Sequence, residues 1–238
     1  MHQKVYYHLK ILKEQLTQNC EQCKGKGCIV CSAQFDLYQQ YAKAGIPILY
    51  WTLDLKDLDP NGIGIKEVTN YSSRLKMAYD DGKGIFIYGK NGNGKTLSAC
   101  AIGKQAIKQG YNVKYAFLGE MISAFIDTMY NNDQREKLKE DILKVDFLIL
   151  DDIDKAYISE KSEFVSTILD TLFRTRVQHK LPVIMTANKS IEEILGKNQE
   201  VYSKSLISLF KESLLPIMFH GGDKREELSR QSREKFFK

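Results

Sequence analysis

The stretch Gly89-Lys90-Asn91-Gly92-Asn93-Gly94-Lys95-Thr96 limits what this chain can fold into more than any other part of it. It fits the phosphate-binding pattern G-x-x-x-x-G-K-[ST]. The apolar run 84–88 before it is short enough for a buried strand, and residues 97–109 after it have the pattern of a helix. A glycine-rich turn with a solvated lysine is the alternative. Because strand, loop and helix are all in place, the sequence predicts a nucleotide-binding α/β fold.

Each part of this loop has an expected role. The glycines let backbone N–H groups surround the β- and γ-phosphates, and the start of the next helix adds partial positive charge. Lys95 brings a positive charge to the same oxygens, and the Thr96 hydroxyl can hold Mg²⁺. The expected nucleotide-binding residues are Gly89, Lys90, Asn91, Gly92, Asn93, Gly94, Lys95, Thr96 and Leu97.

Two further strand ends carry polar residues that suit ATP hydrolysis. The apolar run 147–150 ends in Asp151 and Asp152, and the run 182–185 leads through Thr186 to Asn188. Asp151 would bind Mg²⁺ or a water on it, and Asp152 would activate the attacking water. Asn188 would hydrogen-bond the γ-phosphate and that water without adding charge. Acids that cap a strand and an asparagine in a turn are the alternatives.

The order of elements predicts the architecture. Strand-like runs at 84–88, 111–118, 145–150, 182–185 and 214–219 alternate with helical patterns at 71–79, 97–109, 120–130, 133–143, 160–179 and 203–212. Such alternation favours a central parallel sheet flanked by helices. The turn Asp59-Pro60-Asn61-Gly62 is a plausible boundary, so we expect an ATPase domain at 59–238 and a separate module at 1–58.

The module at 1–58 contains a compact cysteine cluster. Cys20, Cys23, Cys28 and Cys31 form C-x₂-C-x₄-C-x₂-C, between helical patterns at 1–16 and 33–44. Two such hooks can offer four sulfurs to one tetrahedral ion, so we expect structural zinc. A redox dithiol pair and an iron–sulfur cluster are the alternatives. Cys100 stands apart and is expected to be a small core residue.

Composition and charge set wider limits. The 238 residues are 43% hydrophobic and 27% charged, as in ordinary soluble globular proteins, and no apolar run is long enough for a membrane helix. No signal-peptide pattern is present, so a cytoplasmic protein is expected. The formal net charge of +5 permits an acidic partner such as nucleic acid, although a solvated basic surface is the alternative.

The phosphate loop, the Asp151-Asp152 pair and the Thr186-Ala187-Asn188 strand end resemble the DnaC/DnaI-type helicase loaders and the related IstB-type transposition helpers, a branch of the AAA+ ATPases. Residues 219–225 are similar to the G-x-D-x-R element of this branch, and the chain ends soon afterwards, without a helical lid domain. A zinc-bearing segment ahead of the ATPase also resembles the DnaI type. The resemblance covers approximately residues 45–226.

The resemblance implies ATP, Mg²⁺ and Zn²⁺ as cofactors, and a replicative helicase and single-stranded DNA as partners. It also implies that a neighbouring subunit's arginine completes the ATPase site of a homo-oligomer. The helix at 203–212 departs from the family here, because Leu209 and Ser205 stand at the matching places. Arg176 is the candidate instead, followed by Arg174, and Arg225 could contact phosphate within its own subunit.

Basic residues that could contact DNA are scattered. Solvated helix surfaces are the alternative for most of them. The candidates are Lys104, Lys108, Lys155, Lys224, Arg225, Arg230, Arg233, Lys235 and Lys238, with Phe236 and Phe237 as stacking residues.

The main functional hypothesis is an ATPase that loads a replicative helicase onto single-stranded DNA. An IstB-type helper would prefer duplex DNA and a transposase. A small-molecule P-loop kinase and an ATP-binding adaptor without turnover are rivals from other classes.

Overall fold

The computed structural model describes residues 3–128, 130–155, 162–196 and 204–220. Its centre is a five-stranded parallel sheet in the order β2-β3-β4-β1-β5. The strands are β1 (Gly84–Tyr88), β2 (Val113–Phe117), β3 (Phe147–Asp151), β4 (Val183–Ala187) and β5 (Leu214–Met218). All five strands expected from the sequence are present, and the parallel sheet is confirmed.

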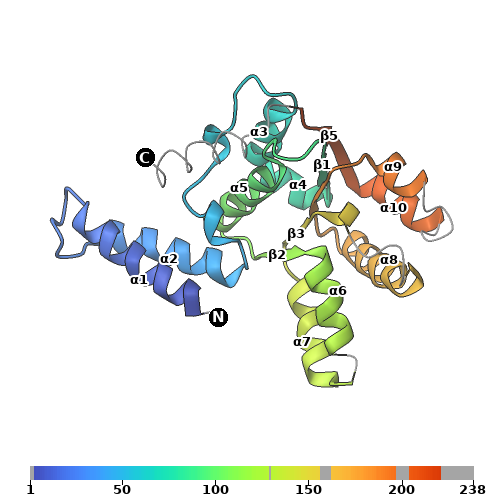
Figure 1. Ribbon diagram of the computed structural model, residues 1–238, viewed down its shortest axis with the longest axis horizontal. Helices are drawn as coiled ribbons and strands as arrows, with labels where there is room; N and C mark the ends of the chain where they lie inside the picture. The colour runs from blue at the N-terminus through green and yellow to red at the C-terminus, as the bar shows by residue number, and fades with distance from the viewer. Residues whose placement is uncertain (1–2, 129, 156–161, 197–203, 221–238) are drawn as a thin grey trace, which may run out of the picture.

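Helices cover both faces of this sheet (Figure 1). The strands alternate apolar side chains between two cores, because successive residues of a strand point to opposite faces. Ile85 and Ile87 pack with the helices before and after β1, whereas Phe86 packs with the helices that follow β2. The helices are α1 (Gln3–Gln18), α2 (Ile29–Lys43), α3 (Ile65–Ser73), α4 (Leu75–Asp81), α5 (Lys95–Lys108), α6 (Leu118–Asp127), α7 (Asn132–Leu143), α8 (Ser162–Gln178), α9 (Ile191–Gly196) and α10 (Lys204–Ser213).

The expected helix at 71–79 differs from the structure in its extent. Helix α3 begins earlier, at Ile65, and it ends at Ser73 before α4 begins at Leu75. Arg74 separates them with φ −118° and ψ 31°, outside the helical region. Helix α9 was not expected, because its six residues are too short to show a helical period.

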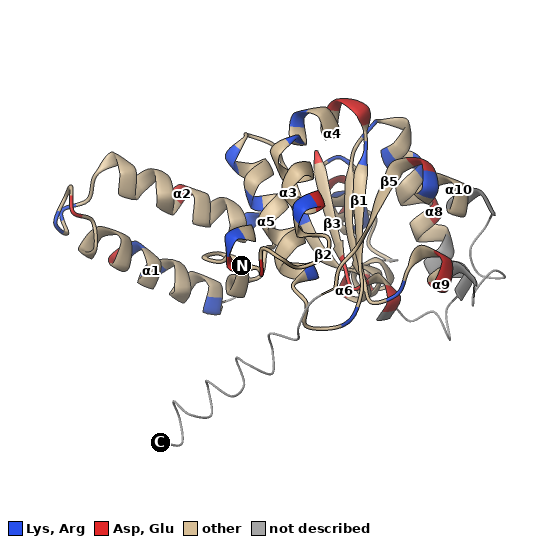
Figure 2. Cartoon of the chain, turned by 90° about the horizontal axis from the view of Figure 1, so that it is seen from above, with Lys and Arg blue, Asp and Glu red and all other residues tan. Residues whose placement is uncertain are grey.

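Helices α1 and α2 form an antiparallel hairpin that projects from the sheet (Figures 1 and 2). The end of α2 packs on α5, and the chain then continues through short 3₁₀ turns, η1 (Ile48–Tyr50) and η2 (Leu55–Asp57). Tyr41, Trp51 and Leu58 belong to the same buried core as the strands and α5. The boundary at 58/59 stays a prediction, and hydrophobic packing is continuous across it.

The helices of the described part of the chain are too short or too polar to cross a lipid bilayer.

Candidate nucleotide site and metal centre

Three expected motifs meet at one edge of the sheet. Strand β4 lies between β1 and β3, and all three run parallel. Their carboxyl ends therefore lie side by side, and open α/β sheets bind ligands at this edge. The phosphate loop follows β1, the pair Asp151-Asp152 lies at the end of β3, and Asn188 follows β4.

Two glycines of the phosphate loop have no room for a side chain. Gly89 has φ 143°, and a Cβ there would lie 2.0 Å from the carbonyl oxygen of Phe219. Gly94 has φ 92°, and a Cβ there would lie 2.3 Å from the side chain of Leu58. Positive φ values suit glycine because it lacks a Cβ. The loop is thus closely packed on both sides and leads directly into α5, which begins at Lys95.

The ammonium group of Lys95 lies inside the loop. It donates to the carbonyl oxygens of Gly89 at 2.8 Å and Lys90 at 2.7 Å, and the side chain is 6% exposed. Asn93 Oδ1 is 3.4 Å away, and Asn93 Nδ2 donates to the Phe219 carbonyl at 2.8 Å. The Asn93 side chain therefore ties the loop to the end of β5, while Lys95 is held beside the loop's own carbonyls.

Asp151 lies where a magnesium ligand is expected. Thr96 Oγ1 donates to its carboxylate at 3.1 Å from Oδ1, across 55 residues of sequence. The phosphate loop and the acidic motif are thus in direct contact. Hydroxyl and carboxylate oxygens are the protein ligands that Mg²⁺ prefers, so Thr96 and Asp151 fit the ion expected here.

Two more hydroxyl groups reach the same carboxylate. Tyr115 donates to Asp151 Oδ2 at 2.7 Å, and Thr186 donates to Oδ1. Burial and the nearby charge of Asp151 raise the pKa of Tyr115, so its hydroxyl keeps its proton. No role at Asp151 is expected for either residue from the sequence alone. Both lie on expected strands, but only the sheet brings them to Asp151.

Asp152 adopts an unusual backbone conformation. Its φ is 57°, in the left-handed region, where residues other than glycine are uncommon. Its N–H donates to Thr186 Oγ1 at 3.0 Å. Such conformations persist where surrounding contacts hold them, and they occur often at functional sites. The hydrogen bond with Thr186 supplies one such contact at the residue expected to activate water.

Asn188 is held by Asp154, in the turn after β3. Its backbone N–H donates to Asp154 Oδ1 at 3.0 Å, and its Nδ2 lies 3.4 Å from the same oxygen. Its own Oδ1 is buried without a hydrogen-bond partner among the described residues. A buried amide oxygen of this kind costs free energy unless something donates to it. It suits the expected contact with a water or ligand.

Arg176 does not lie at this edge, and the expectation that it reaches a neighbouring subunit is wrong. Its side chain is fully buried. The guanidinium donates to the carbonyl oxygens of Ile142, Leu143, Asp146 and Pro182 at 2.9 to 3.3 Å. These carbonyls lie at the end of α7 and before β3 and β4, at the opposite edge of the sheet. Arg176 therefore stabilises the fold.

The other cationic candidates have different environments. Arg174 is bonded to Asp170 and its side chain is 46% exposed. Lys104 is 2% exposed and donates to the carbonyl oxygens of Leu53 and Trp51, so the expectation that it contacts DNA is wrong. Lys108 is at the surface, 3.8 Å from Asp54. Lys155 ends a short turn, and its side chain is outside the described part. Residues 221–238 are also outside it, so Arg225, the other tail cations and the two phenylalanines are not described.

The four clustered cysteines converge at the tip of the hairpin. Their sulfur atoms all lie within 4.8 Å of one another, and the pairs 20–28, 23–31 and 28–31 are 3.8, 3.7 and 3.6 Å apart. Tetrahedral zinc with Zn–S bonds of about 2.3 Å separates its sulfurs by about 3.8 Å. The donor set and its spacing therefore fit zinc. Cys100, by contrast, is fully buried in the core as expected.

The chain is similar to several known proteins. Residues 65–211, more than half of the chain, match the family model of the bacterial DnaA ATPase domain. The replicative helicase loader DnaC of Escherichia coli is 30% identical over 160 residues, which are 66% of this chain and 64% of that protein. The loader DnaI of Bacillus subtilis is 26% identical over 152 residues, which are 60% and 48%. The initiator DnaA of Mycoplasma genitalium is 30% identical over 134 residues, which are 55% and 29%.

Solved structures show the same fold. A crystal structure of DnaI has a TM-score of 0.63 at 22% identity and covers 74% of this chain and 95% of that one. A DnaC helicase-loader structure has a TM-score of 0.63 at 19% identity and covers 73% and 100%. The chain spans less than two thirds of each of the three sequence relatives above. The match to the family model nevertheless covers β1 to β4, the phosphate loop, the Asp151-Asp152 pair and Asn188, so the chain belongs to the bacterial DnaA ATPase-domain family, with the fold of the DnaI and DnaC structures.

Proposed function

We propose that this protein is an ATP-dependent loader that binds ATP and single-stranded DNA and delivers a replicative helicase. The observation that carries the proposal is the contact between Thr96 and Asp151. It joins the phosphate loop to the acidic motif in the arrangement that magnesium-dependent nucleotide hydrolysis requires. The relatives DnaC and DnaI, both named as replicative helicase loaders, support the choice of partner.

Nucleotide binding would require Lys95 to exchange its partners. The ammonium now donates to two carbonyls of the loop, and phosphate oxygens would accept from it in their place. The exchange is favourable because a bond to a charged acceptor is stronger than one to a neutral carbonyl. The N–H groups of the loop and the start of α5 would add to the binding of the triphosphate. Backbone groups of residues 89–97 would thus hold the nucleotide.

Hydrolysis would use the residues at the ends of β3 and β4. Mg²⁺, when bound, would neutralise charge on the phosphates. Thr96 and Asp151 would hold it, Asp152 would accept a proton from the attacking water, and Asn188 Oδ1 would orient that water. No described arginine lies beside these residues, so an arginine from a neighbouring subunit, or Arg225 of the same chain, is required for strong turnover.

The cysteine cluster would hold zinc with a structural role, because four thiolates leave no open coordination position. We propose that the hairpin it closes binds the helicase. Exposed Ile29 and Val30 lie next to the cysteines, and apolar side chains on a projecting element are common in protein interfaces. DNA contacts are assigned to Lys108, Lys155 and the basic residues of the tail.

The experiment that tests this function mixes purified protein with the replicative helicase of the same organism, with ATP or without nucleotide, and measures co-elution. Binding to single-stranded and duplex DNA is then compared over a salt series. We expect a complex with the helicase and a preference for single strands. A preference for duplex DNA together with binding to a transposase instead would identify an IstB-type helper.

An ATP-turnover assay distinguishes the loader from two other classes of protein, a small-molecule kinase and an ATP-binding adaptor. A small-molecule kinase would transfer phosphate to a metabolite and would not respond to DNA. An adaptor would bind ATP without turnover at any DNA concentration. We expect slow ATP hydrolysis that single-stranded DNA changes.

A further inference from the structure

Tyr115 contacts two parts of the chain that are distant in the sequence. Its side chain reaches the nucleotide site, where the hydroxyl donates to Asp151 Oδ2 at 2.7 Å. Its backbone reaches the hairpin, where the N–H donates to the carbonyl oxygen of Ala44 at 2.7 Å. Ala44 is the C-cap residue that follows α2, and carbonyls at a helix end have no partner within the helix.

The contact with the hairpin lies on the free edge of the sheet. Among the described residues, strand β2 pairs with β3 alone, and its other edge has no neighbouring strand. Ala44 covers that edge at Tyr115, and the next residue, Gly45, has φ 79°. A Cβ at Gly45 would lie 3.1 Å from the Tyr115 carbonyl oxygen. The end of α2 is thus bonded to the Tyr115 N–H through Ala44, and Gly45 lies close to the Tyr115 carbonyl.

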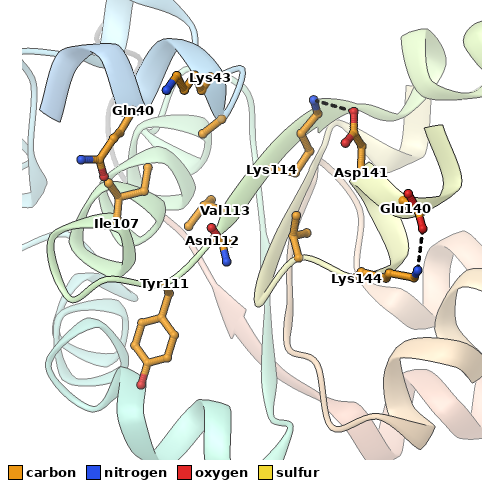
Figure 3. A pocket seen from close by; sticks show the side chains of 12 residues that line it. Gln40, Lys43, Ile107, Tyr111, Asn112, Val113, Lys114, Glu140, Asp141 and Lys144 are labelled. Carbon is orange, nitrogen blue, oxygen red and sulfur yellow. Dashed lines mark hydrogen bonds and ion pairs between the residues drawn. The ribbon is translucent and has the colours of Figure 1, made fainter. Parts of the chain in front are cut away.

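A cavity of about 500 Å³ adjoins this contact (Figure 3). It lies between the end of α2, the end of α5, the start of β2 and the end of α7, and Ala44 and Val113 line it. The hairpin is therefore not fully packed against β2 here. The hydrogen bond from the Tyr115 N–H to Ala44 is a direct connection between the end of α2 and β2 beside this cavity.

The carboxylate at the other end of this connection is sensitive to its hydrogen bonds. Asp151 is 5% exposed, and its carboxylate accepts hydrogen bonds from the hydroxyl groups of Thr96, Tyr115 and Thr186. Groups that hydrogen-bond a metal-binding carboxylate fix its orientation, and their loss typically lowers metal affinity about 10- to 100-fold. Tyr115 is the one of the three that is also bonded to the hairpin.

We propose that Tyr115 is a positioning residue for Asp151. Through it, the end of α2, at the base of the α1–α2 hairpin, is coupled to the expected Mg²⁺ site at Thr96 and Asp151. This inference rests on the proposed function, since it assumes that the site binds Mg²⁺ and ATP. A partner bound to the hairpin would then change the affinity for Mg²⁺, and Mg²⁺ with nucleotide would change the affinity for that partner by the same factor.

The first test is the substitution Tyr115→Phe, which removes one oxygen atom. The measurement is binding of a fluorescent ATP analogue as Mg²⁺ is titrated, and again in EDTA. We expect the half-saturating Mg²⁺ concentration to rise about 10- to 100-fold while binding in EDTA is unchanged. Thermal melting of each variant separates this effect from loss of folding.

Tyr79→Phe is the matched control. Tyr79 also donates its hydroxyl to an aspartate beside β3, at 3.1 Å from Asp146 Oδ1, but at the opposite edge of the sheet. It loses the same kind of bond without touching Asp151, so its Mg²⁺ titration should match the wild type. If Tyr115→Phe also titrates like the wild type, Tyr115 does not position Asp151.

The second test perturbs the hairpin contact without touching the nucleotide site. Gly45→Ala adds a methyl group 3.1 Å from the Tyr115 carbonyl, whereas Gly110→Ala, at φ 90°, adds one where no atom lies within 4 Å. Both strain the backbone, so Gly110→Ala controls for strain. We expect Gly45→Ala alone to shift the Mg²⁺ titration.

The shift should disappear when Gly45→Ala is combined with Tyr115→Phe, because the connection is then already broken. An equal shift in both backgrounds would show that the hairpin acts by another route. If the wild type itself fails to bind nucleotide with Mg²⁺, the proposed function has failed. If it binds and the variants do not differ, only the coupling has failed.

Discussion

The guanidinium of Arg176 lies 2.9 Å from the carbonyl oxygen of Pro182, in the connection that leads into β4. The same side chain bonds carbonyls at the end of α7. Helix ends leave such carbonyls without partners, and Arg176 satisfies them inside the protein. Burial lowers its pKa to about 9, so the side chain stays charged at neutral pH. This arginine joins three elements of one subunit.

Arg176→Ala should therefore destabilise the fold. It leaves several buried carbonyls without donors, and we expect a loss of about 3 kcal/mol or more in the free energy of unfolding, measured in urea. Arg174→Ala is the control on the same helix. Because its pairing with Asp170 is exposed to solvent, its loss should change the free energy of unfolding far less.

If Arg176 instead completes the ATPase site of a neighbouring subunit, we expect the opposite effects on stability and turnover. Arg176→Ala would then unfold like Arg174→Ala but lose turnover, and mixing with a Lys95→Ala variant would restore it. That result would contradict the buried position.

Lys95→Ala should strongly weaken nucleotide binding. The ammonium is the one charged donor of the phosphate loop that is buried in it, so its loss should weaken ATP affinity at least about 10-fold. Lys90→Ala is the control, because Lys90 lies exposed in the same loop and contributes its carbonyl to the Lys95 contact. Calorimetric titration with ATP and Mg²⁺ measures both. Wild-type affinity in Lys95→Ala would refute the site.

Asp152→Asn should separate binding from hydrolysis. Asparagine tolerates the φ of 57° found here, so the backbone can keep its conformation. The amide cannot accept a proton from water as a carboxylate does, and we expect turnover to fall about 100- to 10,000-fold. ATP affinity should stay as in the wild type. A variant that hydrolyses ATP normally would show that Asp152 is not the base.

The sheet could be predicted because each strand is a short apolar run next to a turn or polar residue. The position of Arg176 could not be taken from the family resemblance, yet the sequence held a signal for it. Leu169, Leu172 and Phe173 are buried on α8, and position 176 continues their spacing of three and four residues. An arginine on the apolar face of a helix was therefore a candidate for burial.

The hydrogen-bond partners of Asp151, unlike the burial of Arg176, could not be predicted from a local sequence pattern. Tyr115 pairs with Ile149 and Phe117 with Asp151, so the register places Tyr115 on the same face as Asp151. Nothing local in the sequence specifies that register. Thr186 likewise depends on β4 lying beside β3. These contacts arise from strand order, which short motifs do not contain.

Lys104→Met tests whether Lys104 stabilises the fold instead of contacting DNA. The ammonium is buried below the segment that contains Trp51 and Leu53, and burial lowers its pKa below the ordinary 10.5. The variant should lose about 1 to 3 kcal/mol of stability at neutral pH, since two carbonyls lose a donor. The salt dependence of binding to single-stranded DNA should not change, whereas Lys108→Ala should reduce it.

The pH dependence of stability gives a second readout for Lys104. Between its folded pKa and 10.5 the unfolded chain binds more protons at this site, so this lysine makes stability rise with pH in that window. Lys104→Met should lack this rise in urea unfolding measured across the window. An unchanged pH dependence would mean that the lysine titrates as if exposed.

Removing the hairpin's metal should change the hairpin and leave the nucleotide site able to bind. The purified protein should contain about one zinc per chain by elemental analysis, and a strong chelator should release it. Cys23→Ser should lower the zinc content and the melting temperature, because metal bound only to the folded state stabilises it. Cys100→Ala is the control, since its thiol is buried in the core away from the cluster.

Nucleotide binding in EDTA should persist in Cys23→Ser, because the cluster lies at the tip of the hairpin and the phosphate loop lies at the sheet edge (Figure 1). If the purified protein contains iron and absorbs visible light, the four cysteines hold an iron–sulfur cluster and not zinc. If it contains no metal, a redox dithiol pair is the remaining assignment.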